Sequence, residues 1–142
     1  MELLKLLKAK NAYLKKFLIC TEDLVPLVES GDFSTLTAFQ KRRDSILKGI
    51  QFFDQKISNA LLNISETKTT PSLINAVVEL VETKTHLIQT IILADQRIMA
   101  AIEAEKNRLQ KEAIASDRSQ QLVKKFRSSW ISESGEQLDG KV

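Results

Sequence analysis

Residues 36–64 read LTAFQKRRDSILKGIQFFDQKISNALLNI, and this stretch decides the fold. Along it, residues recur at steps that alternate strictly between three and four, and all but one of them are apolar. The series consists of Leu36, Phe39, Arg43, Ile46, Ile50, Phe53, Ile57, Ala60 and Ile64. Because an α-helix has about 3.6 residues per turn, such a series forms a narrow stripe that leaves water by interlocking with another helix. The stretch therefore predicts a helix that packs against partner helices.

The composition of the chain favours an all-helical domain. The chain has 142 residues, of which 43% are hydrophobic and 27% charged, and it holds four glycines and two prolines. Few helix breakers suit long helices, and the length suits one domain. We expect residues 1–130 to form a helical bundle domain and residues 131–142, which are polar with two glycines, to form a disordered tail.

Breaker residues separate the first two predicted helices. The first is expected over Glu2–Glu29, with an early end or a kink near Asp23 because Pro26 lacks a backbone donor. Gly31 suits the left-handed position that follows a helix, and Asp32 is suited to cap the next one. That second helix is expected from Phe33 to about Ile64.

The third predicted helix starts at Pro71, with Thr70 as its cap. The residues allow it to run to about Ala115, or without a break to Trp130. Its apolar stripe ends at Ile102, which we expect to lie level with the start of the second helix. The remainder is therefore predicted to project on the order of 20 Å beyond the bundle.

The apolar pattern returns after this projection, in a short amphipathic element that contains Leu122, Val123, Phe126 and Trp130. Asp117 is suited to cap it as a separate helix that folds back on the bundle, and an unbroken third helix is the alternative. The predicted fold is therefore all-α, an elongated antiparallel bundle of three long helices with a short C-terminal amphipathic helix.

A short turn at Gly31 makes the first two helices antiparallel, so residues whose numbers sum to about 63 are expected at similar heights. The expected neighbours are Phe39 with Leu24, Ile46 with Phe17, and Ile57 with Leu7. Arg43 falls near Cys20 and Thr21. It either finds a charge partner in Glu22 or Asp23, or sends its head into water along an apolar stem.

The residues offer little catalytic or metal-binding equipment. The single histidine, His86, lies near Glu79 and Glu82, but Thr83 stands where a Glu-x-x-His pair needs its carboxylate. No glycine-rich phosphate loop occurs. Arginine clamps of the helical chorismate mutase kind are a weaker explanation than helix-surface charge for Lys41, Arg42, Arg43 and Lys48. We expect a protein that is not an enzyme and has no cofactor and no metal.

Charge and cysteine content indicate the compartment and exclude some partners. The net charge of +3 is small, and the basic residues after position 105 are mixed with acidic ones, which argues against nucleic acid. The lysine-interrupted N-terminal region lacks a secretory signal, and its leucines are better explained by core packing than by a membrane surface. No apolar run approaches the roughly 20 residues that a membrane span requires. Cys20, the single cysteine, fits a packed thiol in a reducing compartment, so we expect a cytoplasmic protein.

The third predicted helix is more apolar than an outer bundle position requires. Apolar residues cover nearly its whole circumference at Leu87, Ile88, Ile91, Ile92, Leu93 and Ala94. They could be covered by the C-terminal helix, by a second copy in a homodimer or by an amphipathic helix from another protein, and ordinary burial is the alternative. The predicted partner-binding residues are Leu87, Ile88, Ile91, Ile92, Leu122, Val123, Phe126 and Trp130.

Several stretches carry a resemblance to a known family. They are ESGDFSTL at 29–36, FQKRRDSILKGI at 39–50, ADQRI at 94–98, KNRL at 106–109 and KKFRSSW at 124–130. Their order resembles the FliT and FlgN type of flagellar export chaperones. The resemblance covers most of the chain at low specificity, because heptad helices resemble one another.

The resemblance implies a cytoplasmic chaperone of type III export. Its partners would be a secreted flagellar subunit of the cap or hook–filament junction type and the export apparatus. It also implies that the C-terminal helix, here with Leu122, Val123, Phe126 and Trp130, masks the binding groove. The alternatives are a coiled-coil adaptor and a nucleic-acid-binding helical protein.

Overall fold

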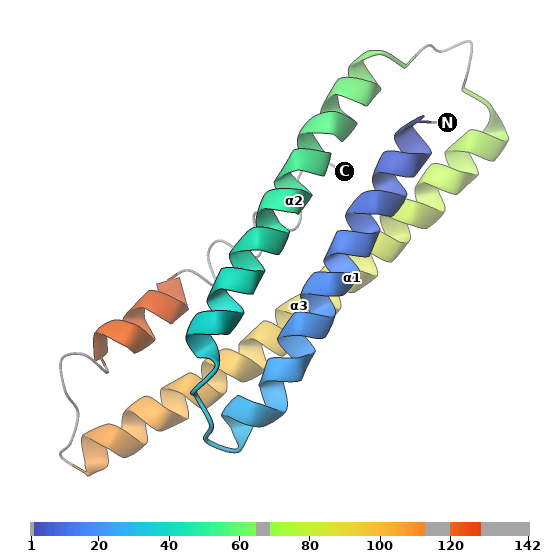
Figure 1. Cartoon of the computed structure of the whole chain (residues 1–142). Helices are drawn as coiled ribbons and strands as arrows, with labels where there is room; N and C mark the ends of the chain where they lie inside the picture. Colours follow the sequence, from blue (N-terminus) through green and yellow to red (C-terminus); the bar gives the residue numbers. More distant parts are fainter. Residues whose placement is uncertain (1, 65–68, 113–119, 129–142) are drawn as a thin grey trace.

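Three long helices form the body of the computed structural model, which describes residues 2–64, 69–112 and 120–128 (Figure 1). They are α1 (Glu2–Glu29), α2 (Leu36–Leu62) and α3 (Pro71–Lys111). Residues 120–128 form a further helical segment, which we call the C-terminal segment. The described residues contain no strand, which confirms the predicted all-α helical bundle.

The helix α1 lies between the other two, antiparallel to α2 and parallel to α3 (Figure 1). Its buried positions include Leu3, Leu7, Lys10, Leu14, Phe17, Thr21, Leu24 and Val28, which again alternate by three and four residues. A matching buried series on α3 consists of Lys84, Ile88, Ile91, Asp95, Ile98 and Ile102. Heptad stripes on all three helices therefore interlock into one elongated core.

The turn between α1 and α2 differs from its prediction in two details. The helix α1 spans the predicted range Glu2–Glu29 and continues through Pro26, so the alternative of an early end near Asp23 is wrong. A proline in the last turn removes one hydrogen bond, and burial of Val25 and Val28 beside it offsets that loss. Gly31 has the expected positive φ of 90°.

The second difference concerns the start of α2, at Leu36 instead of Phe33. Asp32 does not cap the helix itself. Its Oδ1 accepts hydrogen bonds from the backbone N–H of Ser34 (3.0 Å) and the Ser34 hydroxyl (2.6 Å). Asp32 therefore fixes the turn that precedes the helix, because an aspartate readily holds the backbone two residues ahead.

The start of α3 is as predicted, and its end is not. The Thr70 hydroxyl accepts the backbone N–H of Leu73 at 3.1 Å, and Pro71 is the first helical residue. The helix ends at Lys111, so the alternative of an unbroken helix to Trp130 is wrong. The residues outside the described part of the chain include Ala115, Asp117, Trp130 and the predicted tail at 131–142. Nine residues follow Ile102, the last buried residue of α3, which gives a projection of about 14 Å.

The core confirms the predicted register of α1 and α2. Leu24 clusters with Phe39, Phe17 with Ile46, and Leu7 with Ile57. Arg43 is 1% exposed and its guanidinium carbon lies 5.5 Å from the centre of the Phe17 ring. The alternative in which its head reaches water is therefore wrong.

Candidate partner-binding site

The predicted docking residues on α3 lie in the bundle core. Leu87, Ile88 and Ile91 are buried in a cluster with residues of α1 and α2 such as Phe17 and Ile50. The expectation that they remain available on the surface is wrong, because α3 packs its apolar stripe into the core that all three helices share. Ile92 is half-buried at the edge of the same cluster.

A different apolar surface lies at the end of the bundle where α2 begins. Its floor consists of Phe33 from the turn before α2, Leu36 at the start of α2, and Ile102 and Leu109 from α3. The C-terminal segment lies against this floor (Figure 1). We call these four residues the apolar floor.

The C-terminal segment is attached to the apolar floor chiefly through one aromatic ring. Phe126 is 3% exposed and belongs to the same core cluster as Leu36 and Ile102. Val123 is partly buried against that cluster, whereas Leu122 remains 45% exposed. Three of the four predicted binding residues near the C-terminus therefore lie at this surface, and the fourth, Trp130, lies outside the described residues.

The contact between the segment and the floor is incomplete. A pocket of about 190 Å³ remains there, lined by Phe33, Leu36, Ile102, Glu105, Leu109, Leu122, Val123 and Phe126. The floor therefore offers more apolar surface than the segment fills.

Charged groups surround this surface. Arg127 of the C-terminal segment forms an ion pair with Glu103 of α3. On the projecting part of α3, Arg108 donates hydrogen bonds to Glu105 (2.6 Å) and Glu112 (2.9 Å). The bond from Arg108 lowers the pKa of Glu105 below its usual value, so this carboxyl stays ionised at neutral pH. An apolar floor with a charged rim is typical of a protein-binding surface.

A second depression runs along α1 and α3 and is less suited to an apolar ligand. Two hollows of about 440 and 450 Å³ share the residues Glu29 and Arg97. The Arg97 guanidinium donates two hydrogen bonds to the Glu29 carboxylate, at 2.6 and 3.1 Å. This bridge crosses the depression, and beyond it small side chains such as Ala100 and Ala104 line the wall.

The described residues show neither a metal-binding cluster nor an activated thiol. Among them, no group of three or more histidine, cysteine, aspartate and glutamate side chains is arranged to hold a metal ion. Burial raises the pKa of the Cys20 thiol, and this effect is larger than the lowering by Arg42. The reactive thiolate is therefore disfavoured. In the described part of the chain, no helix combines the length and the apolar character needed to cross a membrane.

Sequence reasoning missed three buried charged residues, namely Lys10, Lys84 and Asp95. Lys10 Nζ lies 2.7 Å from Asp54 Oδ1, which joins α1 to α2. All three occupy heptad positions among apolar neighbours. The alternation of three and four residues that identified Arg43 on α2 would have found them, had it been applied to the other two helices.

Comparisons of the chain with protein-family models, curated proteins and solved structures found no match. The case for a function therefore depends on the chemistry of the surface itself.

Proposed function

We propose that this protein is a cytoplasmic export chaperone of the flagellar, type III kind. It binds a helical terminal segment of a secreted filament-associated subunit and passes it to the export apparatus. The observation that carries the proposal is the C-terminal segment on the apolar floor, because the chain thereby holds an amphipathic helix on a surface that another helix could take.

The attachment of the C-terminal segment is weak enough for exchange. Burial of one phenylalanine contributes at most about 3 kcal/mol, and an exposed ion pair such as Arg127 with Glu103 adds about 1 kcal/mol or less. Ordering the segment opposes these terms. A closed state favoured by a few kcal/mol leaves the open state at about 0.1–10% of molecules, which a ligand can select.

The docked segment also indicates what a partner should present. Leu122, Val123 and Phe126 follow the spacing of one helix face. A partner helix with two or more large apolar residues one turn apart would contact the same floor and fill the pocket beside it. The proposed partner-binding residues are therefore Phe33, Leu36, Ile102 and Leu109, in place of Leu87, Ile88 and Ile91.

The test compares binding of terminal peptides from cap and hook–filament junction subunits to the full chain and its variants. Phe126→Ala weakens the cover, so the affinity for a cognate peptide should rise by about 10- to 100-fold. Lys124→Ala, an exposed change on the same segment, is the matched control and should leave the affinity unchanged. Leu109→Ala removes part of the apolar floor and should lower the affinity for the peptide.

Two results would contradict the proposal. One is that none of the terminal peptides binds the full chain or Phe126→Ala. The other is that Phe126→Ala lowers peptide affinity while its urea unfolding remains cooperative, because the segment would then be part of the binding surface and not its cover.

A further inference from the structure

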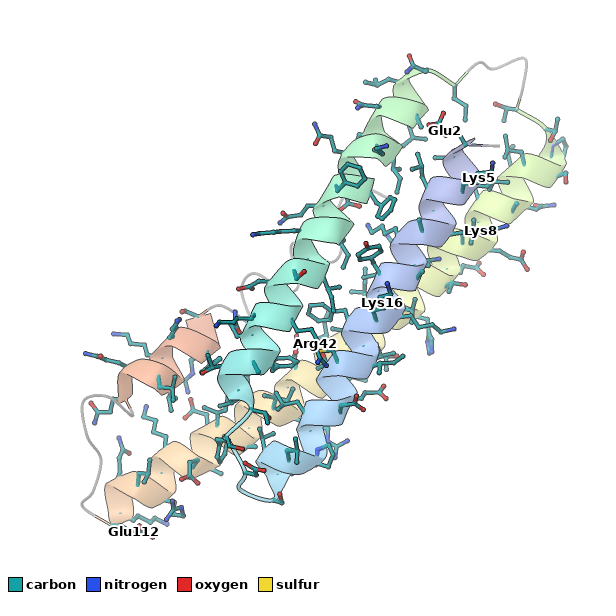
Figure 2. The ribbon with its side chains drawn as sticks, viewed as in Figure 1. Glu2, Lys5, Lys8, Lys16, Arg42 and Glu112 are labelled. Carbon is teal, nitrogen blue, oxygen red and sulfur yellow. The ribbon has the colours of Figure 1, made fainter. Side chains whose placement is uncertain are left out.

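The helix α1 carries its five lysines in one stretch, and its four carboxylates lie outside that stretch. Residues 3–21 hold five lysines and no acidic residue, which exceeds the net charge of +3 of the whole chain. Lys10 is buried beside Asp54, and the other four lysines are exposed. Figure 2 shows Lys5, Lys8 and Lys16 along α1, with Arg42 of α2 beside it.

Six of the exposed residues of α1 form a regular outer stripe opposite its core seam. The stripe consists of Lys5, Lys8, Ala12, Lys15, Ile19 and Glu22, which alternate by three and four residues and are all exposed. Ile19, at 55% exposure, is a large apolar side chain among these charges. This spacing is that of a contact line for one further helix.

The lysines of the outer stripe have no ion pair with a carboxylate among the described residues. Neighbouring like charges such as Lys5 and Lys8 destabilise a helix slightly. On the projecting part of α3, by contrast, Arg108 is bound by Glu105 and Glu112. The outer stripe thus presents positive charge that a ligand could neutralise.

The surroundings of the stripe favour a narrow anionic ligand over a broad one. Glu2 lies near one end of the stripe, and Glu22 of the stripe itself and Asp23 lie at the other. The register set by Asn11 and Leu80 brings Glu79 and Glu82 of α3 level with its middle. A flat anionic membrane would meet these carboxylates as well as the lysines. A single acidic helix would contact the lysines and Ile19 and would avoid most of these carboxylates.

Nucleic acid fits the stripe less well. Binding of single strands uses exposed aromatic faces for stacking. The aromatic ring beside the stripe is Tyr13, which packs 5.3 Å from the ring of Phe53 and has the Lys16 ammonium 4.9 Å from its centre. The Tyr13 ring is therefore already engaged by Phe53 and by the Lys16 ammonium.

We propose that the outer stripe of α1 is a second docking surface, which binds an acidic amphipathic helix of another protein. It is separate from the apolar floor, so both surfaces could be occupied at once. Carboxylates of the partner would face Lys5, Lys8 and Lys15, and an apolar residue would pack on Ile19. The proposal does not depend on the export function proposed above.

The test uses the full chain and a labelled helical peptide of about three heptads. The peptide carries glutamates at the positions that face the three lysines and leucine at the position that faces Ile19. We expect binding that weakens as salt is added, because the contacts are exposed charges. Lys8→Gln combined with Lys15→Gln should weaken binding by about 5- to 10-fold.

The matched control is Lys41→Gln with Lys48→Gln, which removes the same charge from exposed positions of α2. It should change the affinity by less than about twofold. The proposal is overturned if the control weakens binding as much as the stripe variant, or if a scrambled peptide of equal composition binds equally well. Tighter binding to phosphatidylserine vesicles or to DNA than to the peptide would overturn it too.

Discussion

At the scale of single residues, the core contains charged side chains where a heptad bundle would normally place apolar ones. Lys10 on α1, Arg43 on α2, and Lys84 and Asp95 on α3 are all buried. Burial of a charge costs more than burial of a leucine would contribute. Such residues can fix which helices pair and in what register, as polar core positions do in coiled coils.

The pair of Lys10 and Asp54 gives this idea a direct test. Asp54→Ala leaves the Lys10 ammonium buried without its carboxylate, and we expect a loss of about 3 kcal/mol in the free energy of unfolding. The double change Lys10→Met with Asp54→Leu should restore most of the stability, because it removes the desolvation cost of both ions. Urea unfolding of each variant measures these differences.

The matched control for this test is Asp44→Ala, which removes an exposed carboxylate from α2. It should change stability by about 0.5 kcal/mol or less. A loss for Asp54→Ala no larger than that of the control would show that water reaches Lys10, since Asp54 itself is 17% exposed.

At the scale of elements, local signals set the helix ends where the deciding contact is local. The Thr70 hydroxyl and Pro71 determine the start of α3 within four residues of sequence. The local expectation that Pro26 ends α1 early was wrong, because packing of Val25 and Val28 holds the last turn of the helix. Local preference therefore prevails where few tertiary contacts compete with it.

The cap of α3 yields a prediction at this scale. Thr70→Ala removes the oxygen that accepts the Leu73 N–H, and we expect a loss of about 1 kcal/mol in stability. Thr70→Ser keeps the oxygen and should retain most of the stability. Thermal unfolding followed by circular dichroism compares the three proteins, and equal losses for alanine and serine would argue against a capping role.

At the scale of the whole molecule, the position of α1 between α2 and α3 decides which apolar residues are buried. The long apolar run on α3 looked like surplus surface in the sequence, but its stripe faces the shared core. Exposed apolar surface on α3 is instead found at positions such as Leu93, outside that stripe.

Two residues of α3 that are close in sequence differ in burial. Ile91 is 0% exposed and Leu93 is 63% exposed. Ile91→Ala should lower the free energy of unfolding by about 2–5 kcal/mol, because it leaves a cavity in the core. Leu93→Ala should change it by about 0.5 kcal/mol or less. Similar effects of the two variants in urea unfolding would contradict the packing described for α3.

The sequence by itself determined the helices, the antiparallel register of α1 and α2, and the fold class. These follow from heptad spacing, from caps and from glycine and proline, all of which act between residues close in the chain. The C-terminal residues Leu122, Val123 and Phe126 were also identifiable as an amphipathic set, because their spacing is local.

Only the tertiary structure decided which apolar faces became core and which became a surface for partners. The burial of Ile91 depends on residues more than 40 positions away, such as Ile50. The apolar floor and the segment that covers it likewise bring together Phe33, Ile102 and Phe126, which no local pattern connects. Burial is a property of how whole helices are placed, and periodicity marks a face as apolar without saying what will cover it.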